Sequence, residues 1–208
     1  MRYDLHTHTK YSKCSALKPE ILLKIARKKG LDGIAVTDHN TMIGAKEARK
    51  LNKDDDFEVI LASEIRTDYG DVLIYYLEEE INSKELFTVL DKAKEQDAIV
   101  SIAHPFRPFK ISRFNYPIKD ISDRINAIEC VNARTFYWEN NKANNIANEL
   151  KLAKTAGSDA HFSLEVGNAV TVFDGDLRKA IKKRSTTVEG RSLVIPLLIA
   201  LSGIKKRI

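Results

Sequence analysis

The chain has 208 residues, of which 43 % are hydrophobic and 30 % are charged, a composition that indicates a folded protein and excludes a disordered one. Its formal net charge of +5 suits an anionic substrate, but many proteins with no nucleic-acid role carry as much positive charge. The two cysteines exclude a disulfide framework, and the longest apolar run is far short of the roughly 20 residues that span a bilayer. We therefore expect a cytoplasmic protein with no transmembrane segment and a single domain over residues 1–208.

Strand-like and helix-like stretches alternate along the chain. Short apolar runs predict strands at residues 2–6, 33–37, 57–63, 71–77, 98–103, 127–131 and 169–173, and 154–157 leads into a polar motif. Helical spacing predicts helices at 19–29, 42–51, 83–96, 138–152 and 176–183. Pro19 suits the first turn of the first helix, Gly30 follows its end, and Ser83 is the expected N-cap of the third. The strand at 169–173 and the helix at 176–183 are the last elements expected.

Repeated strand–helix units of this length predict an α/β fold with a parallel sheet, either open or closed into a barrel. Polar motifs follow at least six of the predicted strands. An open sheet would gather its ligand from only two or three strand ends, whereas a barrel places its active site on the loops at the C-terminal ends of all its strands. We therefore predict a barrel. Residues 106–124 form one long irregular segment, which we expect to be functional because long ordered loops usually are.

All five histidines lie at or just after predicted strand ends, beside other polar residues. They are His6, His8, His39, His104 and His161. In an extended segment residues i and i+2 point to the same side, so His6 and His8 can face one ion, and so can Asp159 and His161. Each pattern is weak alone, since a single histidine at such a position is more often a hydrogen-bonded core residue. Their joint placement at one end of one ring predicts a metal centre.

Two glutamates complete this set of candidate ligands. Glu64 ends an apolar run, where a carboxylate is costly unless it is paired or coordinated, and a position bridging two ions would offset that cost. Glu129 is either a ligand or a paired buried acid, and its neighbour Cys130 is expected to face away from the barrel interior. Imidazoles and carboxylates suit Zn²⁺, Mn²⁺ or Fe²⁺ alike. Eight ligands are too many for one ion and predict two or three, a cluster that can hold a phosphoryl group and activate water.

Six motifs now stand in order along the chain. They are D-L-H-T-H-T (4–9), T-D-H-N (37–40), S-E (63–64), A-H-P (103–105), I-E-C-V-N-A-R (128–134) and G-S-D-A-H (157–161). Together they resemble the polymerase and histidinol phosphatase (PHP) superfamily. The resemblance implies a distorted (β/α)7 barrel and a di- or trinuclear metal centre that hydrolyses phosphoesters.

The same resemblance implies how the ligands are shared and which residues are catalytic. One ion would be held by His6, His8, Glu64 and Asp159, a second by Glu64, His104 and Glu129, and a third by His39 and His161. The residues expected to be catalytic are Asp159, His161 and His39.

The third ion is the point at which the chain departs from the family pattern. Many members carry an acidic or histidine ligand shortly after H-x-H, whereas this chain reads Y-S-K-C-S at 11–15 and has no carboxylate or histidine before Glu20. Cys14 could replace the ligand, although a loop thiol beside a lysine is more often simply exposed. We expect the third ion to bind weakly, or only with substrate present.

Substrate phosphate also needs cationic donors. Arg107 follows the A-H-P motif and Arg134 follows the strand of Glu129, and the planar guanidinium suits phosphate oxygens. Lys10 and Arg113 are further candidates. The alternative for each of them is a solvated surface residue.

Three functions remain open at this stage. The leading hypothesis is a stand-alone phosphoesterase that acts on a nucleotide or another small phosphorylated molecule. The second is a nuclease acting on polynucleotide ends, which predicts a basic groove with stacking aromatic residues, and aromatic and basic residues do alternate in 106–116. A nucleic-acid partner is compatible with this chain but not favoured. The third is a non-catalytic PHP-like binding module, which predicts that metal ligands have been lost. A histidinol phosphate phosphatase is disfavoured, because those family members are usually longer than this chain.

Residues 192–208 form an apolar and basic C-terminal tail. Apolar side chains occupy almost every position of 193–201 instead of one stripe, so a single helix face cannot bury them all. The tail could be a helix that covers the barrel, a membrane-surface anchor or an oligomer contact, and little of it before Lys205 is polar enough for a surface anchor. We expect burial on two sides, against the barrel and against a second subunit, which would give a homo-oligomer.

Overall fold

The computed structural model describes residues 1–108 and 113–192. The expected oligomer contact at 193–208 lies outside the described residues and stays a prediction. Within them the strands are β1 (Arg2–Thr7), β2 (Gly33–Val36), β3 (Glu58–Thr67), β4 (Gly70–Tyr75), β5 (Ile99–Ile102), β6 (Ala127–Asn132), β7 (Ala153–Gly157), β8 (Ala169–Val172) and β9 (Thr187–Gly190). The helices are α1 (Pro19–Lys28), α2 (Ile43–Leu51), α3 (Leu86–Glu95), α4 (Tyr137–Glu149) and α5 (Leu177–Lys183), with a short 3₁₀ helix at Ile118–Ile121.

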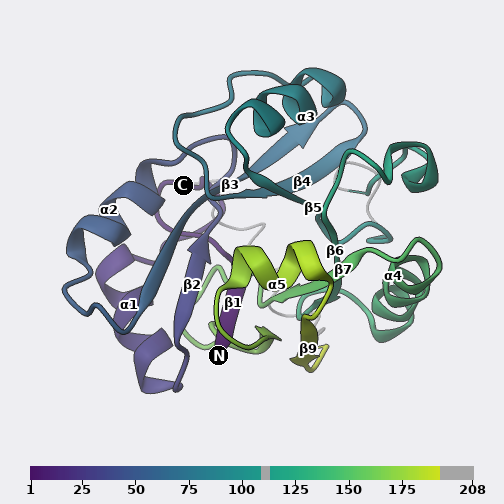
Figure 1. The fold of residues 1–208 in the computed structure, drawn as a ribbon. Coiled ribbons are helices and arrows are strands. Elements are labelled where there is room, and N and C mark those ends of the chain that lie inside the picture. The colour runs from purple at the N-terminus through teal and green to yellow at the C-terminus, as the bar shows by residue number, and fades with distance from the viewer. Residues whose placement is uncertain (109–112, 193–208) are drawn as a thin grey trace.

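A single sheet curves into a barrel, with helices on its outside (Figure 1). Strands β7 to β1 follow one another in the order 7-6-5-4-3-2-1, and β8 and β9 continue the sheet beyond β1. This arrangement confirms the expected distorted seven-stranded barrel. In the described part of the chain, no helix is both long enough and apolar enough to cross a membrane.

The expectation that the sheet is parallel throughout is wrong for three strands. Strand β4 runs antiparallel to both β3 and β5, because the two residues Asp68 and Tyr69 that join it to β3 are too few for a crossover connection. Strand β8 is antiparallel to β1, and β9 is antiparallel to β8. Strand β9 was not expected at all. Its four residues are mostly exposed and lack an apolar run, so nothing in their pattern indicates a strand.

The barrel closes between the C-terminal ends of β1 and β7. The amide of Asp159 donates to the carbonyl of His6 at 2.7 Å, and the amide of His8 donates to the carbonyl of Ala160 at 2.9 Å. Gly157 makes this approach feasible, because a Cβ at that position would lie only 2.2 Å from the Cβ of His6. The closure therefore places two of the polar motifs directly beside each other.

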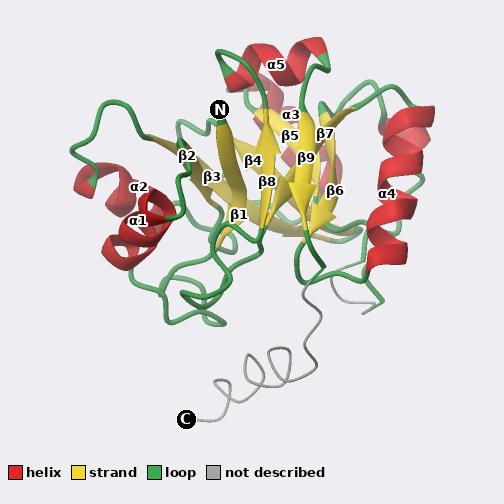
Figure 2. Cartoon of the chain, turned by 90° about the horizontal axis from the view of Figure 1, so that it is seen from below, coloured by secondary structure: helices red, strands yellow, loops and turns green. Residues whose placement is uncertain are grey.

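Apolar side chains fill the barrel interior toward the end where β1 begins. Leu5, Leu73 and Tyr75 are fully buried there, and Leu177 and Ile181 of α5 pack into the same cluster. Helix α5 accordingly lies across this end of the barrel in both views (Figures 1 and 2). The opposite end, where the parallel strands finish, is left for polar side chains.

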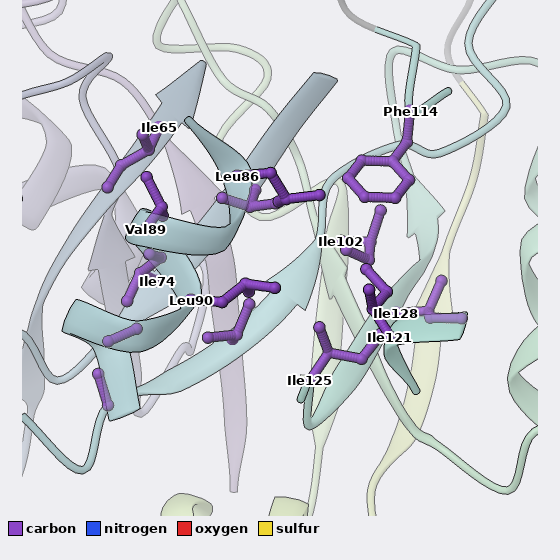
Figure 3. Packing of buried hydrophobic residues seen from close by; sticks show 14 of the residues in the cluster. Ile65, Ile74, Leu86, Val89, Leu90, Ile102, Phe114, Ile121, Ile125 and Ile128 are labelled. Carbon is purple, nitrogen blue, oxygen red and sulfur yellow. The ribbon is translucent and has the colours of Figure 1, made fainter. Parts of the chain in front are cut away.

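The outer faces of the strands carry a second apolar layer. Leu86, Val89 and Leu90 of α3 share one helix face and pack on Ile74 and Ile102 (Figure 3). Because buried Cys130 belongs to this outer cluster, the prediction that it faces away from the barrel interior is confirmed.

Two expectations at helix starts have different outcomes. Pro19 is the first residue of α1, as expected. The expectation of Ser83 as the N-cap of α3 is wrong: Glu85 is the cap, and its carboxylate accepts hydrogen bonds from the amides of Phe87 and Thr88. A carboxylate suits this position because its negative charge also interacts favourably with the positive end of the helix dipole.

Candidate metal centre

The eight residues expected to bind metal lie together inside the barrel, toward the C-terminal ends of its strands. They come from β1, β3 and β6 and from the segments that follow β1, β2, β5 and β7. In three subsets the potential ligand atoms lie within 4.8 Å of one another: His6, His8 and Glu64; His8, His39 and His161; and His6, His104 and Asp159. The structure thus brings the predicted residues into one cluster.

Glu64 lies at the middle of this cluster. Its Oε2 is 2.9 Å from Nδ1 of His39 and 3.4 Å from Nε2 of His8, while its Oε1 is 2.9 Å from Nε2 of His104. The two oxygens therefore face different histidines, as they would in a residue that bridges two ions. The expectation that Glu64 follows the end of its strand is wrong, because β3 continues to Thr67. The strand continues there because it pairs with β4 along its whole second half.

Asp159 faces His6 and His8 from the other side of the barrel seam. Its Oδ1 lies 3.2 Å from Nε2 of His8 and 3.6 Å from Nε2 of His6. Its Oδ2 accepts a hydrogen bond from Arg107. The backbone of Asp159 has a φ of 55°, a left-handed conformation that non-glycine residues rarely adopt and that clusters at functional sites.

Glu129 differs from a simple ligand in its surroundings. Its Oε1 lies 2.8 Å from Nδ1 of His6, and its Oε2 accepts hydrogen bonds from the amide of His104 at 2.8 Å and from the side chain of Asn132 at 3.1 Å. The contact with His6 turns the other ring nitrogen of that histidine toward His8. Orientation of this kind is typical of carboxylates behind metal-binding histidines. Direct ligation by Glu129 remains a prediction.

The charges in this buried cluster are strongly coupled. Burial alone would lower the pKa of His6, but the carboxylates of Glu129, Asp159 and Glu64 raise it well above its usual value. Burial alone would raise the pKa of Asp159, but Arg107 and His6 hold it well below its usual range. The carboxylate of Asp159 therefore stays ionised.

The donor set fits transition-metal ions. Glu64, Glu129 and Asp159 are each at most 2 % exposed, and buried carboxylates at this density need cations beside them. Nδ1 of His104 is buried without a hydrogen-bond partner in the described part of the chain. Imidazole nitrogens and carboxylate oxygens together are suitable ligands for Zn²⁺, Mn²⁺ or Fe²⁺.

Sequence reasoning missed Asp71 on β4. This residue is buried, and its carboxylate forms a compact group with Glu64 and His104 in which the potential ligand atoms lie within 4.8 Å of one another. It also accepts hydrogen bonds from Arg66 at 3.0 and 3.2 Å. The available signal was the same as for Glu64: a carboxylate at one end of an apolar strand.

Two further buried aspartates, Asp4 and Asp38, accept hydrogen bonds from the segments that carry the histidines. Asp4 accepts hydrogen bonds from the amides of Ser158 and Gly167, and burial raises its pKa to about 6. Asp38 accepts from Ser12, whose hydroxyl also lies 3.2 Å from Nδ1 of His8. Asp38 does not cap the helix that follows it, since the N-cap of α2 is Met42.

The candidate phosphate-binding residues lie at different distances from the cluster. Arg107 contacts it directly, because its guanidinium is hydrogen-bonded to Asp159. Arg134 lies further out, with Nε 3.6 Å from Oε1 of Glu165, a residue that accepts a hydrogen bond from the amide of His161. Lys10 lies at the rim, 3.4 Å from a carboxylate oxygen of Glu47. A role in binding phosphate remains a prediction for all three.

An aromatic group lies on the segment that follows β6. The rings of Phe136 and Trp138 stack with centroids 4.6 Å apart and planes 8° from parallel. Tyr137 is 68 % exposed and Trp138 is 55 % exposed. These residues come only a few positions after Asn132, which contacts both Glu129 and Asp159. Exposed aromatic rings therefore stand at the start of α4.

Comparison with known proteins agrees with this geometry. A family model described as PHP-associated matches residues 138–186. The uncharacterized protein MJ1587 of Methanocaldococcus jannaschii is 34 % identical over 160 residues, which cover 71 % of this chain and 89 % of that protein. A second protein of that organism, MJ0417, is 35 % identical over 179 residues, which cover 83 % and 70 %.

Among solved structures, the fold resembles a two-domain protein from Bacteroides vulgatus that contains a predicted PHP-like metal-dependent phosphoesterase. The TM-score is 0.78 at 19 % sequence identity, and the match covers 99 % of this chain and 69 % of that chain.

Proposed function

Because the chain belongs to the PHP superfamily, we propose that it is a metal-dependent phosphoesterase that hydrolyses a small phosphorylated substrate. The observation that carries the proposal is the position of Glu64. Its carboxylate is buried, with Oε2 facing His39 and His8 and Oε1 facing His104. A position of this kind suits a centre of two or three divalent ions.

The ligands of these ions are proposed from the cluster itself. His6, His8, Glu64 and Asp159 would hold one ion, Glu64 and His104 with Glu129 a second, and His39 and His161 a third. Bound Zn²⁺, Mn²⁺ or Fe²⁺ would supply Lewis acidity toward the phosphoryl oxygens and an activated water.

The residues of the chain itself perform three further tasks in this proposal. Arg107 offers its guanidinium to a phosphoryl oxygen beside Asp159, where charge builds up during the reaction. Asp159 orients the attacking water. In protein that lacks the third ion, His39 can donate a proton to the leaving oxygen, with His161 as the second candidate. The side chain of His39 is 26 % exposed and lies closer to solvent than the nearly inaccessible His6 and His8.

The aromatic group at the start of α4 favours a nucleotide among small phosphorylated substrates. Exposed rings of Trp138 and Tyr137 can stack on a planar base while the phosphate lies at Arg107. The nuclease alternative finds less support, because two of the aromatic residues on which it relied are packed away. Phe114 is 6 % exposed, and Tyr116 packs edge-on against Tyr69.

Activity measurements on metal-loaded protein test this proposal. Protein loaded separately with Zn²⁺, Mn²⁺ and Fe²⁺ is incubated with mononucleotides, nucleoside bisphosphates, sugar phosphates and short single strands, and release of phosphate or nucleotide is measured. We expect hydrolysis of a small substrate that disappears after chelation and in the Glu64→Gln variant. Hydrolysis that survives chelation and the Glu64→Gln change would show that the cluster is not the active site. Metal binding without turnover of any substrate would support a binding module.

A further inference from the structure

The loop between β1 and α1 brings Cys14 to the edge of the metal centre. Its sulfur lies 3.1 Å from Nε2 of His161, and it lies near the side chain of His39. The hydroxyl of the next residue, Ser15, holds the loop in place by donating to the carbonyls of His8 at 3.2 Å and His161 at 3.1 Å. The thiol is therefore positioned by the same backbone that positions two of the histidines.

An independent observation indicates that a ligand belongs at this point. Ring nitrogens of His8, His39 and His161 lie within 4.8 Å of one another. The carboxylates nearest to them, Glu64 and Asp159, also face His104 and His6, so these three rings share both carboxylates with other histidines. The Nδ1 of His161 faces the carbonyl oxygen of Asp159 at 2.7 Å, so its Nε2 is the nitrogen turned toward Cys14. A ring held in this way at one nitrogen is oriented to bind an ion through the other.

We infer that Cys14 is a metal ligand, and that its thiolate, together with His39 and His161, holds the third ion of the centre. The inference rests on the proposed function, since it assumes that the cluster binds ions. Binding breaks the S–H bond and forms a metal–sulfur bond, and the proton passes to solvent. A thiolate is a softer ligand than a carboxylate, so this position should prefer Zn²⁺ over Mn²⁺.

Cobalt substitution gives a direct readout that does not depend on activity. Co²⁺ replaces Zn²⁺ in such sites, and a thiolate bound to it produces a charge-transfer absorption in the near ultraviolet. The chain has only two cysteines, so the matched control is Cys130→Ala, which removes a sulfur that packs in the outer core. We expect the band in the wild-type protein and in Cys130→Ala, and its loss in Cys14→Ser.

A second variant separates ligation from mere folding of the loop. Cys14→Asp keeps a negative ligand but no sulfur, so it should bind the same number of cobalt ions as wild type without the band, while Cys14→Ser should bind one fewer. X-ray absorption of zinc-loaded wild type should show a metal–sulfur distance of about 2.3 Å that Cys14→Asp lacks.

The possible results separate this inference from the proposed function. Wild-type protein that binds two or more cobalt ions without any sulfur signal would overturn the role of Cys14 and leave the metal centre intact. A band that persists in Cys14→Ser would overturn it as well. Wild-type protein that binds no ion would overturn both.

Discussion

Replacing Arg107 with Met is the most direct way to test the electrostatics of the candidate centre. The side chain of Arg107 is 18 % exposed and that of Asp159 is 3 % exposed, so their ion pair is largely buried. Methionine keeps most of the apolar stem but removes the charge. The carboxylate of Asp159 then keeps only weak polar support on its Oδ2 side, where Asn132 lies at 3.4 Å.

The size of the effect follows from the burial of this pair. Breaking a buried ion pair by removing one partner costs about 3–5 kcal/mol, because the other charge is left without compensation. In a chain of this size 1 kcal/mol shifts Tm by about 2–4 °C, so metal-free Arg107→Met should melt about 6–20 °C below the wild type. Bound ions would compensate the charge of Asp159, so metal-loaded protein should lose much less.

Calorimetric melting of both proteins, with chelator and with excess metal, measures these shifts. The matched control is Arg124→Ala, which breaks the more exposed pair with Asp91 and should cost at most about 1 kcal/mol. If Arg107 also binds phosphate, the variant should lose about 2–5 kcal/mol of transition-state stabilisation, measured as a fall in kcat/KM at unchanged metal content. A metal-free variant that melts within about 3 °C of wild type would refute the electrostatic reasoning.

Three other changes probe the same region. Glu64→Gln should lower metal content at two positions, and unchanged content by elemental analysis would argue against bridging. The raised pKa of His6 means that its charge stabilises the metal-free protein below pH about 6.5, and that this contribution is lost as pH rises through the raised pKa. Metal uptake should therefore release protons, which calorimetric titration in two buffers measures. Gly157→Ala places a Cβ 2.2 Å from that of His6 and should reduce metal content. The control Gly30→Ala meets nothing within 4 Å, so it should keep its metal content, although its φ of 68° makes alanine there lower the stability.

Most of the barrel could be predicted because its strands are short apolar runs followed by polar motifs. The direction of β4 could not, because a strand's apolar pattern is the same whichever way it runs. The direction is indicated instead by the short connection from β3, since Asp68 and Tyr69 are too few residues to join parallel strands. Strand β9 was missed for a different reason: it pairs at the outer edge of β8 and needs no apolar residues to do so.

The candidate ligands could be predicted because histidines and acids at strand ends are rarely needed for packing. Their partners could not, since those depend on which strands become neighbours. Nothing near Arg107 in the sequence indicates that it would meet Asp159, 52 residues later. The same holds for Cys14, whose contact with His161 spans 147 residues and arises only when the barrel closes.

The seam between β1 and β7 has a consequence for how the protein is made. His6 and Ser158 are 152 residues apart, yet the cluster lies across the line where their strands meet. A ribosome-bound chain would carry its first two histidines long before their partners emerge, and any fragment ending before His161 would lack part of the centre. Ions bound by residues of both strands would stabilise the contact between the first and the last parts of the barrel to be synthesised. In protein made without metal, we expect this seam to unfold locally before the rest of the barrel.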